Sequence, residues 1–218
     1  MSRLVLHSDH VKKNISVDEA FINMFKSNKK IKLGYIPSQS DDEDKTWFKK
    51  KCEWYSQFGI TDILYFDIDK EYDAKKKKEL LNCDAIFLSG GDTYYFLNSL
   101  KKRGFINVLQ SYVKSGGVLI GLSAGAIMFS NTIDIVTLHD ENTTDLKDFT
   151  ALGLVDFDFF PHLNHNETYL NDIIEYSKVN NKTIYACNDG DGIIVNGDNI
   201  QFIGDVLKVK NGEVSMVK

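Results

Sequence analysis

The sequence predicts an α/β fold in three layers (α/β/α), with a mostly parallel sheet between two layers of helices. Two observations lead to this class. Short runs rich in apolar residues alternate with segments whose apolar residues recur at helical spacing, and the strand runs are apolar on both faces, as in buried parallel strands. The 218 residues, 43% of them hydrophobic, are enough to bury a core and fall near the size range of one domain. We therefore expect a single domain over residues 1–218.

The first half of the chain supplies the repeating strand and helix units. A strand followed by a helix and a second strand favours a right-handed crossover and a parallel pair. The expected strands are LVLH at 4–7, IKLGYIP at 31–37, ITDILYFDI at 60–68, AIFLSGG at 85–91 and GGVLIGLS at 116–123. The expected helices lie near 17–27, 44–58, 73–81, 93–102 and 105–114.

The pattern is less regular in the second half. IDIV at 133–136 has the composition of a strand, and the polar stretch 137–148 that follows is long enough to be a functional loop. VDFDFFPH at 155–162 predicts a further strand, followed by a helix from about Glu167 to Val179. In the tail, Asn-Gly and Gly-Asp pairs separate β-prone runs, which predicts short antiparallel strands or hairpins at one edge.

Composition argues against several classes of function. The formal net charge of -5 gives no electrostatic reason to bind nucleic acid or an anionic membrane surface. The three cysteines are widely spaced, without a CxxC pair or a histidine at zinc-ligand spacing, so we expect reduced thiols, no metal site and no cofactor. The N-terminal segment is too short and too polar for a signal peptide or a membrane span, so we expect a cytoplasmic location.

The stretch VLIGLSAGAIMF places a serine between two glycines where a buried strand ends. A GxSxG turn between a strand and a helix presents the serine hydroxyl above the edge of the sheet, in the arrangement called a nucleophile elbow. Gly121 and Gly125 leave room for neighbouring backbone, and the new helix begins with free amide donors. Small residues at such a turn also serve packing, so the pattern alone makes Ser123 only a candidate nucleophile.

A second glycine turn, LSGGDT, ends the preceding strand and leads into the next helix. In a parallel sheet such a turn lies on the carboxyl side, where binding sites form. The amide of Gly90 or Gly91, together with that of Ala124, can donate to an oxyanion that forms beside Ser123. The alternative is a phosphate-binding turn, or a turn that is merely tight.

A serine hydroxyl needs a positioned base, and the sequence offers five histidines. We prefer His162, because FFPHLNH ends a strand with a proline that fixes the local backbone. A carboxylate must then orient the imidazole. The polar loop offers Asp140 and Glu141, and Asp134 comes from the segment before it. The spacing does not choose among these three acids.

Together these segments resemble the peptidase E family of serine peptidases, which contains aspartyl dipeptidase and, more distantly, cyanophycinase. The shared pattern is LSGGDTYYF, then GGVLIGLSAGA, then FFPHLNH, in matching order and spacing from about residue 85 to 165. That family is similar to the class I glutamine amidotransferase fold, a flavodoxin-like topology, with serine in place of the cysteine nucleophile. The resemblance therefore implies that fold for this chain.

Carried over by position, the resemblance implies Ser123 as nucleophile, His162 as base, and Gly90 with Ala124 as oxyanion donors. The acid aligns less cleanly because the polar loop differs in length, so Asp140 is preferred over Glu141. Aspartate-specific members carry an arginine on the helix after the histidine. Here that helix reads NETYLNDIIEYSK, so an arginine from elsewhere, Arg3 or Arg103, would have to replace it.

These observations predict a serine peptidase that acts on small peptide substrates, as a dipeptidase or another exopeptidase. Two other functions stay open: an esterase or amidase with the same catalytic residues, and a non-catalytic binding module that keeps the amidotransferase-like fold. The sequence is silent on assembly, and a homodimer stays open.

Overall fold

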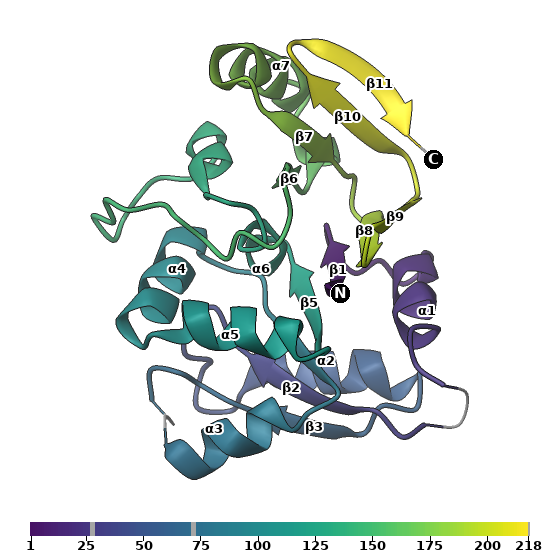
Figure 1. The fold of residues 1–218 in the computed structure, drawn as a ribbon, viewed down its shortest axis with the longest axis vertical. Coiled ribbons are helices and arrows are strands. Elements are labelled where there is room, and N and C mark those ends of the chain that lie inside the picture. Colours follow the sequence, from purple (N-terminus) through teal and green to yellow (C-terminus); the bar gives the residue numbers. More distant parts are fainter. Residues whose placement is uncertain (27–28, 71–72, 218) are drawn as a thin grey trace.

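A central sheet of seven strands organises the computed structural model, which describes residues 1–26, 29–70 and 73–217 (Figure 1). Five strands are parallel, in the order β3-β2-β4-β5-β1, and two antiparallel strands, β8 and β9, extend the sheet beyond β1. These strands are β1 (Arg3–His7), β2 (Lys32–Ile36), β3 (Asp62–Tyr65), β4 (Ala85–Leu88), β5 (Val118–Leu122), β8 (Gly192–Asn196) and β9 (Asn199–Ile203). The mostly parallel α/β class predicted from the sequence is confirmed.

Apolar residues on both faces of each central strand explain the three layers. Successive strand side chains point to opposite faces, and in β5 Leu119 packs in one apolar cluster while Val118 and Ile120 pack in the other. The first cluster lies under α3, α4 and α5, and the second under α1 and α2. These helices are α1 (Ser16–Ile22), α2 (Thr46–Ser56), α3 (Ala74–Leu81), α4 (Thr93–Lys102) and α5 (Phe105–Lys114).

The C-terminal part adds a second sheet of four strands, in the order β11-β10-β7-β6. Its strands are β6 (Asp158–Phe160), β7 (Thr183–Ala186), β10 (Val206–Lys210) and β11 (Glu213–Val217), and α7 (Tyr169–Asn180) connects β6 to β7. The antiparallel strands expected in the tail are present, since β7 pairs with β10, β10 with β11 and β8 with β9 in this way. Sequence analysis did not foresee that β7 also pairs with β6 in parallel. The reason is the intervening helix, which returns the chain to the same end of the sheet before β7 begins.

The segment after β5 also differs from expectation. The short helix α6 (Ala124–Ile127) follows Ser123 directly. Residues 133–136 were expected as a strand, but Ile133 caps a 3-10 helix, η1 (Asp134–Leu138), whose apolar Ile135 and Val136 are buried. A run of four apolar residues does not distinguish a strand from a buried helical turn, which is why the strand expectation is wrong here. Among the described residues, none of the helices has the length and apolar character to cross a bilayer.

Candidate active site

Ser123 lies in the sharp turn between β5 and α6, with φ 51° and ψ -115°. A positive φ is rare for a residue with a side chain, and this strained geometry is typical of a nucleophile elbow. The turn is held by the Ser123 amide, which donates to the carbonyl oxygen of His7 at 2.9 Å. Both flanking glycines are required: a Cβ on Gly121 would lie 2.5 Å from backbone of Ala126, and one on Gly125 would lie 2.2 Å from the carbonyl oxygen of Leu88.

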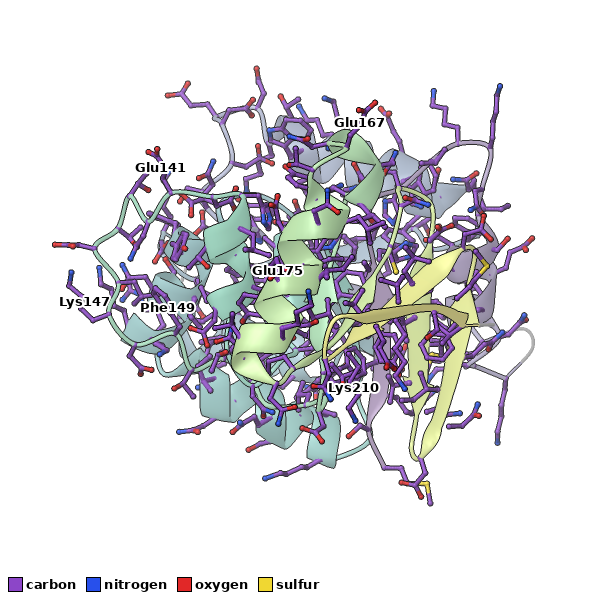
Figure 2. All side chains as sticks on the ribbon, turned by 90° about the horizontal axis from the view of Figure 1, so that it is seen from above. Glu141, Lys147, Phe149, Glu167, Glu175 and Lys210 are labelled. Atoms are coloured by element: carbon purple, nitrogen blue, oxygen red, sulfur yellow. The ribbon has the colours of Figure 1, made fainter. Side chains whose placement is uncertain are left out.

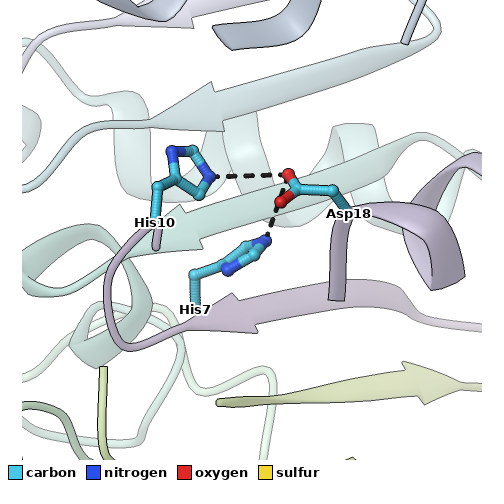
Figure 3. Close-up of side chains that lie close together, drawn as sticks. All are labelled: His7, His10 and Asp18. Atoms are coloured by element: carbon cyan, nitrogen blue, oxygen red, sulfur yellow. Dashed lines mark ion pairs between the residues drawn. The ribbon is translucent and has the colours of Figure 1, made fainter. Parts of the chain in front are cut away.

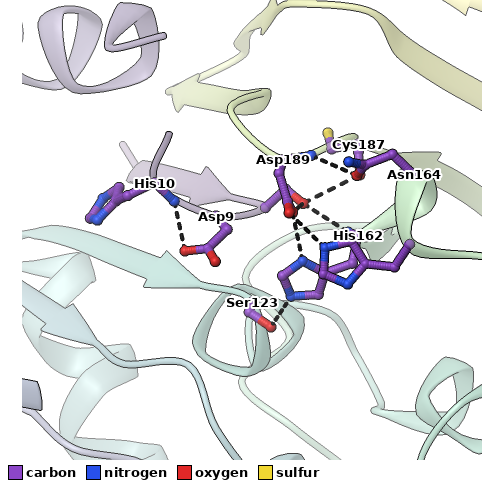
Figure 4. Close-up of polar contacts among 9 residues, drawn as sticks. Asp9, His10, Ser123, His162, Asn164, Cys187 and Asp189 are labelled. Carbon is purple, nitrogen blue, oxygen red and sulfur yellow. Dashed lines mark hydrogen bonds and ion pairs between the residues drawn. The ribbon is translucent and has the colours of Figure 1, made fainter. Parts of the chain in front are cut away.

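His162 reaches the serine from the end of β6, which packs against α6. Its Nε2 lies 2.7 Å from Ser123 Oγ (Figure 4). The residue adopts a left-handed backbone conformation (φ 59°), and its amide donates to Ser8 Oγ at 2.8 Å, which fixes the turn after Pro161. The structure therefore brings together the two side chains that sequence analysis paired across 39 positions.

A carboxylate on the other side of the imidazole belongs to Asp189, in the loop after β7. Its Oδ1 lies 2.7 Å from His162 Nδ1, and its Oδ2 lies 2.6 Å from Nε2 of His165. An ionised carboxylate can only accept, so neutral His162 carries its proton on Nδ1 and accepts the Ser123 hydroxyl hydrogen bond at Nε2. Burial raises the pKa of Asp189, but the hydrogen bonds from His162 and His165 outweigh it, so this pKa lies below its usual value.

The acids expected from the polar loop lie elsewhere. Asp140 and Glu141 are exposed, and Glu141 lies on an outlying loop (Figure 2). Asp134 accepts a hydrogen bond from Thr132 Oγ1 at 2.6 Å. The preference for Asp140 as the partner of the imidazole is therefore corrected to Asp189.

Sequence reasoning missed Asp189 because it took TIYACND as part of an antiparallel tail. The sequence did contain a signal, because a predicted helix separates the β-prone runs VDFDFFPH and TIYACND. Two strands joined by a helix usually pair in parallel, which brings their carboxyl ends to the same edge of the sheet. His162 follows β6 by two residues and Asp189 follows β7 by three, so both leave the second sheet at that edge.

The glycine turn after β4 lies directly beside the serine. A Cβ built on Gly90 would be 3.4 Å from the Cβ of Ser123. Gly91 has φ 135°, and a side chain there would collide with Ser38, whose Oγ donates to the carbonyl oxygen of Gly90 at 2.8 Å. Within the described part of the chain, no hydrogen bond is recorded for the amides of Gly90, Gly91 or Ala124. These amides are available to a bound ligand.

A cavity of about 470 Å³ opens onto Ser123 and His162. Its other walls come from the loop after β2, from α2 and from the loop after β1. Lys51 of α2 lines the cavity together with Asp9; burial lowers the pKa of this lysine, and the charges of Asp9 and Asp18 oppose that effect. A larger groove of about 1050 Å³, which contains Arg3, includes none of the predicted site residues.

Comparison with known proteins shows the family to which the chain belongs. Residues 4–203 match the model of Peptidase family S51. An uncharacterized peptidase of Pasteurella multocida is 31% identical over 134 residues, which are 60% of this chain and 64% of that protein. An uncharacterized peptidase of Listeria monocytogenes is 28% identical over 186 residues, 81% of this chain and 88% of that protein. Peptidase E of Shewanella amazonensis is 29% identical over 140 residues, 61% of this chain and 59% of that protein.

Solved structures show the same fold. A crystal structure of a peptidase E candidate from Listeria monocytogenes superposes with a TM-score of 0.76 at 25% identity, covering 93% of this chain and 98% of that one. A peptidase from an acI-B1 Actinobacterium gives a TM-score of 0.76 at 18% identity, covering 100% and 94%. Because the family match spans nearly the whole chain, the chain belongs to peptidase family S51, a family of serine-type peptidase hydrolases.

Proposed function

We propose that this family member hydrolyses short peptides with Ser123 as nucleophile, His162 as general base and Asp189 as the group that orients the imidazole. The observation that carries the proposal is one continuous chain of hydrogen bonds, from Ser123 Oγ through His162 to Asp189, that opens into a cavity. The spacing at both contacts, 2.7 Å, is within reach for proton transfer and for holding one tautomer.

The reaction follows from these roles. As Ser123 Oγ bonds to the substrate carbonyl carbon, its proton passes to Nε2 of His162. The imidazolium then returns that proton to the leaving amine as the peptide C–N bond breaks. Water, deprotonated by the same imidazole, releases the acyl group and restores the serine. Asp189 stays ionised, which its lowered pKa favours, and stabilises the imidazolium.

Backbone amides can stabilise the oxyanion of the tetrahedral intermediate. The Gly90 or Gly91 amide and the Ala124 amide flank Ser123 and have no recorded acceptor among the described residues. Each oxyanion donor contributes typically about 100- to 1000-fold to kcat in enzymes of this mechanism.

The cavity supports a preference for small substrates rather than a specific side chain. Its volume of about 470 Å³ suits a peptide of a few residues. Neither arginine of the chain lines it: the Arg3 guanidinium donates to the carbonyl oxygen of Met24, and that of Arg103 donates to the carbonyl oxygen of Asp69. Neither Arg3 nor Arg103 is therefore placed to take the role of the arginine of aspartate-specific relatives.

A fluorophosphonate probe followed by a substrate panel tests the proposal. The probe should label the wild-type protein at Ser123 and leave the folded Ser123→Ala variant unlabelled. A panel of dipeptides and tripeptides beside short-chain aryl esters should then show peptide turnover that Ser123→Ala lowers by up to about a million-fold. Ester turnover without peptide turnover would favour an esterase, and absence of labelling in well-folded protein would favour a binding module.

A further inference from the structure

Three side chains that the proposed peptidase does not use converge beside the amino end of α1 (Figure 3). His7 ends β1, His10 lies in the loop that follows, and Asp18 lies in the first turn of α1. All three side chains are at most 4% exposed. Histidine and aspartate are rarely buried without partners, so this cluster requires a physical explanation.

The hydrogen bonds within the cluster are incomplete. His7 Nε2 and His10 Nε2 each lie 3.5 Å from Asp18 Oδ1, which is long for a hydrogen bond. Both ring nitrogens of His7, Nε2 of His10 and Oδ2 of Asp18 are buried, and the described residues offer them no hydrogen-bond partner. Burying a polar group without a partner costs free energy, so these four atoms require partners other than the side chains around them.

We propose that His7, His10 and Asp18 form a binding site for a divalent transition-metal ion of the zinc type. Imidazole nitrogen and carboxylate oxygen are ligands that such ions accept. Zinc bonds of about 2.0–2.2 Å in tetrahedral geometry place neighbouring ligand atoms roughly 3.3–3.6 Å apart. The 3.5 Å contacts from both histidines to Asp18 match that spacing, and the ligand atoms of all three residues lie within 4.8 Å of one another.

The surroundings hold the ligands in place. The ring of His10 stacks on Trp54 with centroids 4.5 Å apart, and Trp54 Nε1 donates to Asp18 Oδ1 at 3.2 Å. Contacts of this kind orient ligands in known metal sites. Lys51 Nζ lies 2.9 Å from His10 Nδ1. With a metal ion on Nε2, His10 Nδ1 would carry the ring proton and face Lys51 Nζ.

The opposite arrangement keeps Lys51 as an ammonium that donates to His10 Nδ1. His10 Nε2 then carries the proton and faces the Asp18 carboxylate, so the cluster is a buried ion network completed by water. This network leaves no lone pair on His10 for a metal. The two arrangements therefore make opposite predictions for metal binding.

The site would link α1 to the chain segment that positions the proposed catalytic residues. The carbonyl oxygen of His7 accepts from the Ser123 amide at 2.9 Å, and the neighbouring Ser8 Oγ accepts from the His162 amide at 2.8 Å. A metal on the side chain of His7 would anchor this segment from its other side. The inference does not depend on the proposed peptidase reaction, and its test requires no activity.

The experiment is metal titration of the full chain after treatment with a chelator. Zn²⁺ binding by calorimetry should give one tight site per chain and raise the Tm, since an ion that binds only the folded state stabilises it. Co²⁺ in the same site should give visible d–d absorption. His10→Gln and, separately, Asp18→Asn should weaken binding by at least about 100-fold, more than loss of an outer-shell partner typically does.

The experiment must distinguish metal binding at His7, His10 and Asp18 from binding at a second cluster. The ligand atoms of His162, His165 and Asp189 also lie within 4.8 Å of one another. His165→Ala removes a ligand there and is the matched control, which should keep the tight site. Circular dichroism and the Tm in chelator establish that each variant is folded; if His10→Gln does not fold, Asp18→Asn decides. Absence of tight binding to the wild type, or binding lost in His165→Ala but kept in the folded cluster variants, would overturn the proposal.

Discussion

Among the described residues, two groups of histidine and aspartate lie near the end of β1, and they differ in how their polar atoms are satisfied. In the first, Asp189 accepts from His162 at 2.7 Å and from His165 at 2.6 Å, beside an open cavity. In the second, His7 and His10 each lie 3.5 Å from Asp18, and several atoms have no hydrogen-bond partner within the described part of the chain. Residue type alone does not separate these two groups.

The difference teaches that access and hydrogen-bond geometry decide the role of such a cluster. Short, aligned contacts beside a cavity hold one tautomer and let a proton move toward a substrate. Buried ligand atoms that face a common point without touching one another suit an ion instead. Each of the following variants separates the two groups on a measurable quantity.

The largest expected effect is on catalysis and concerns the group of His162, His165 and Asp189. Asp189→Asn should lower kcat for peptide hydrolysis by roughly 10³- to 10⁴-fold, because an amide in place of the carboxylate disfavours the required His162 tautomer. Steady-state kinetics on the best substrate of the panel measures it. Asp140→Asn and Glu141→Gln are the matched controls and should stay within about threefold of the parent. Equal losses in all three variants would reject Asp189 as the orienting group.

The second effect is on stability and concerns the group of His7, His10 and Asp18. Asp18→Ala should lower the free energy of unfolding by about 2 kcal/mol in the presence of chelator, because it leaves the partly buried Trp54 Nε1 without its acceptor. Urea denaturation measures this. A loss below about 0.5 kcal/mol, the range of ordinary surface substitutions, would mean that water already satisfies the cluster.

A smaller effect is expected from the second histidine on Asp189. His165 is half exposed and stacks on His162 with ring centroids 4.6 Å apart. Its hydrogen bond to a charged group is worth about 1.5 kcal/mol, so His165→Ala should lower kcat about tenfold with little change in KM. His165→Gln keeps a donor and should recover most of the rate. A rise in KM alone would assign His165 to substrate binding.

The smallest effect concerns pH. Because the folded-state pKa of Asp189 is lowered, its ionised form contributes stability that is fully present above the unfolded pKa of about 3.9. That contribution is lost as the pH falls through the lower folded value. The difference in unfolding free energy between the wild type and Asp189→Asn should therefore stay constant above about pH 5 and shrink below it. Denaturant titrations across that range test the sign, and a difference that grows toward low pH contradicts it.

Much of this protein was readable from local patterns. The predicted helices at 93–102 and 105–114 have the observed bounds, and Ser123 lies in a strained turn between a strand and a helix as expected. His162 also lies at the end of a strand and meets Ser123. These features follow from apolar periodicity and from glycines at a turn, which short stretches of sequence determine.

Local patterns did not predict which distant segments of the chain pair with one another. The sequence determined that apolar strands alternate with helices and that one serine sits in a tight glycine turn, because these depend on neighbours along the chain. Only the tertiary structure decided that β7 lies parallel to β6 and so delivers Asp189, rather than Asp140, to His162. It also decided that His7, His10 and Asp18 share one buried space. Contacts between distant segments depend on how layers pack together, and the spacing of residues along a chain does not contain that information.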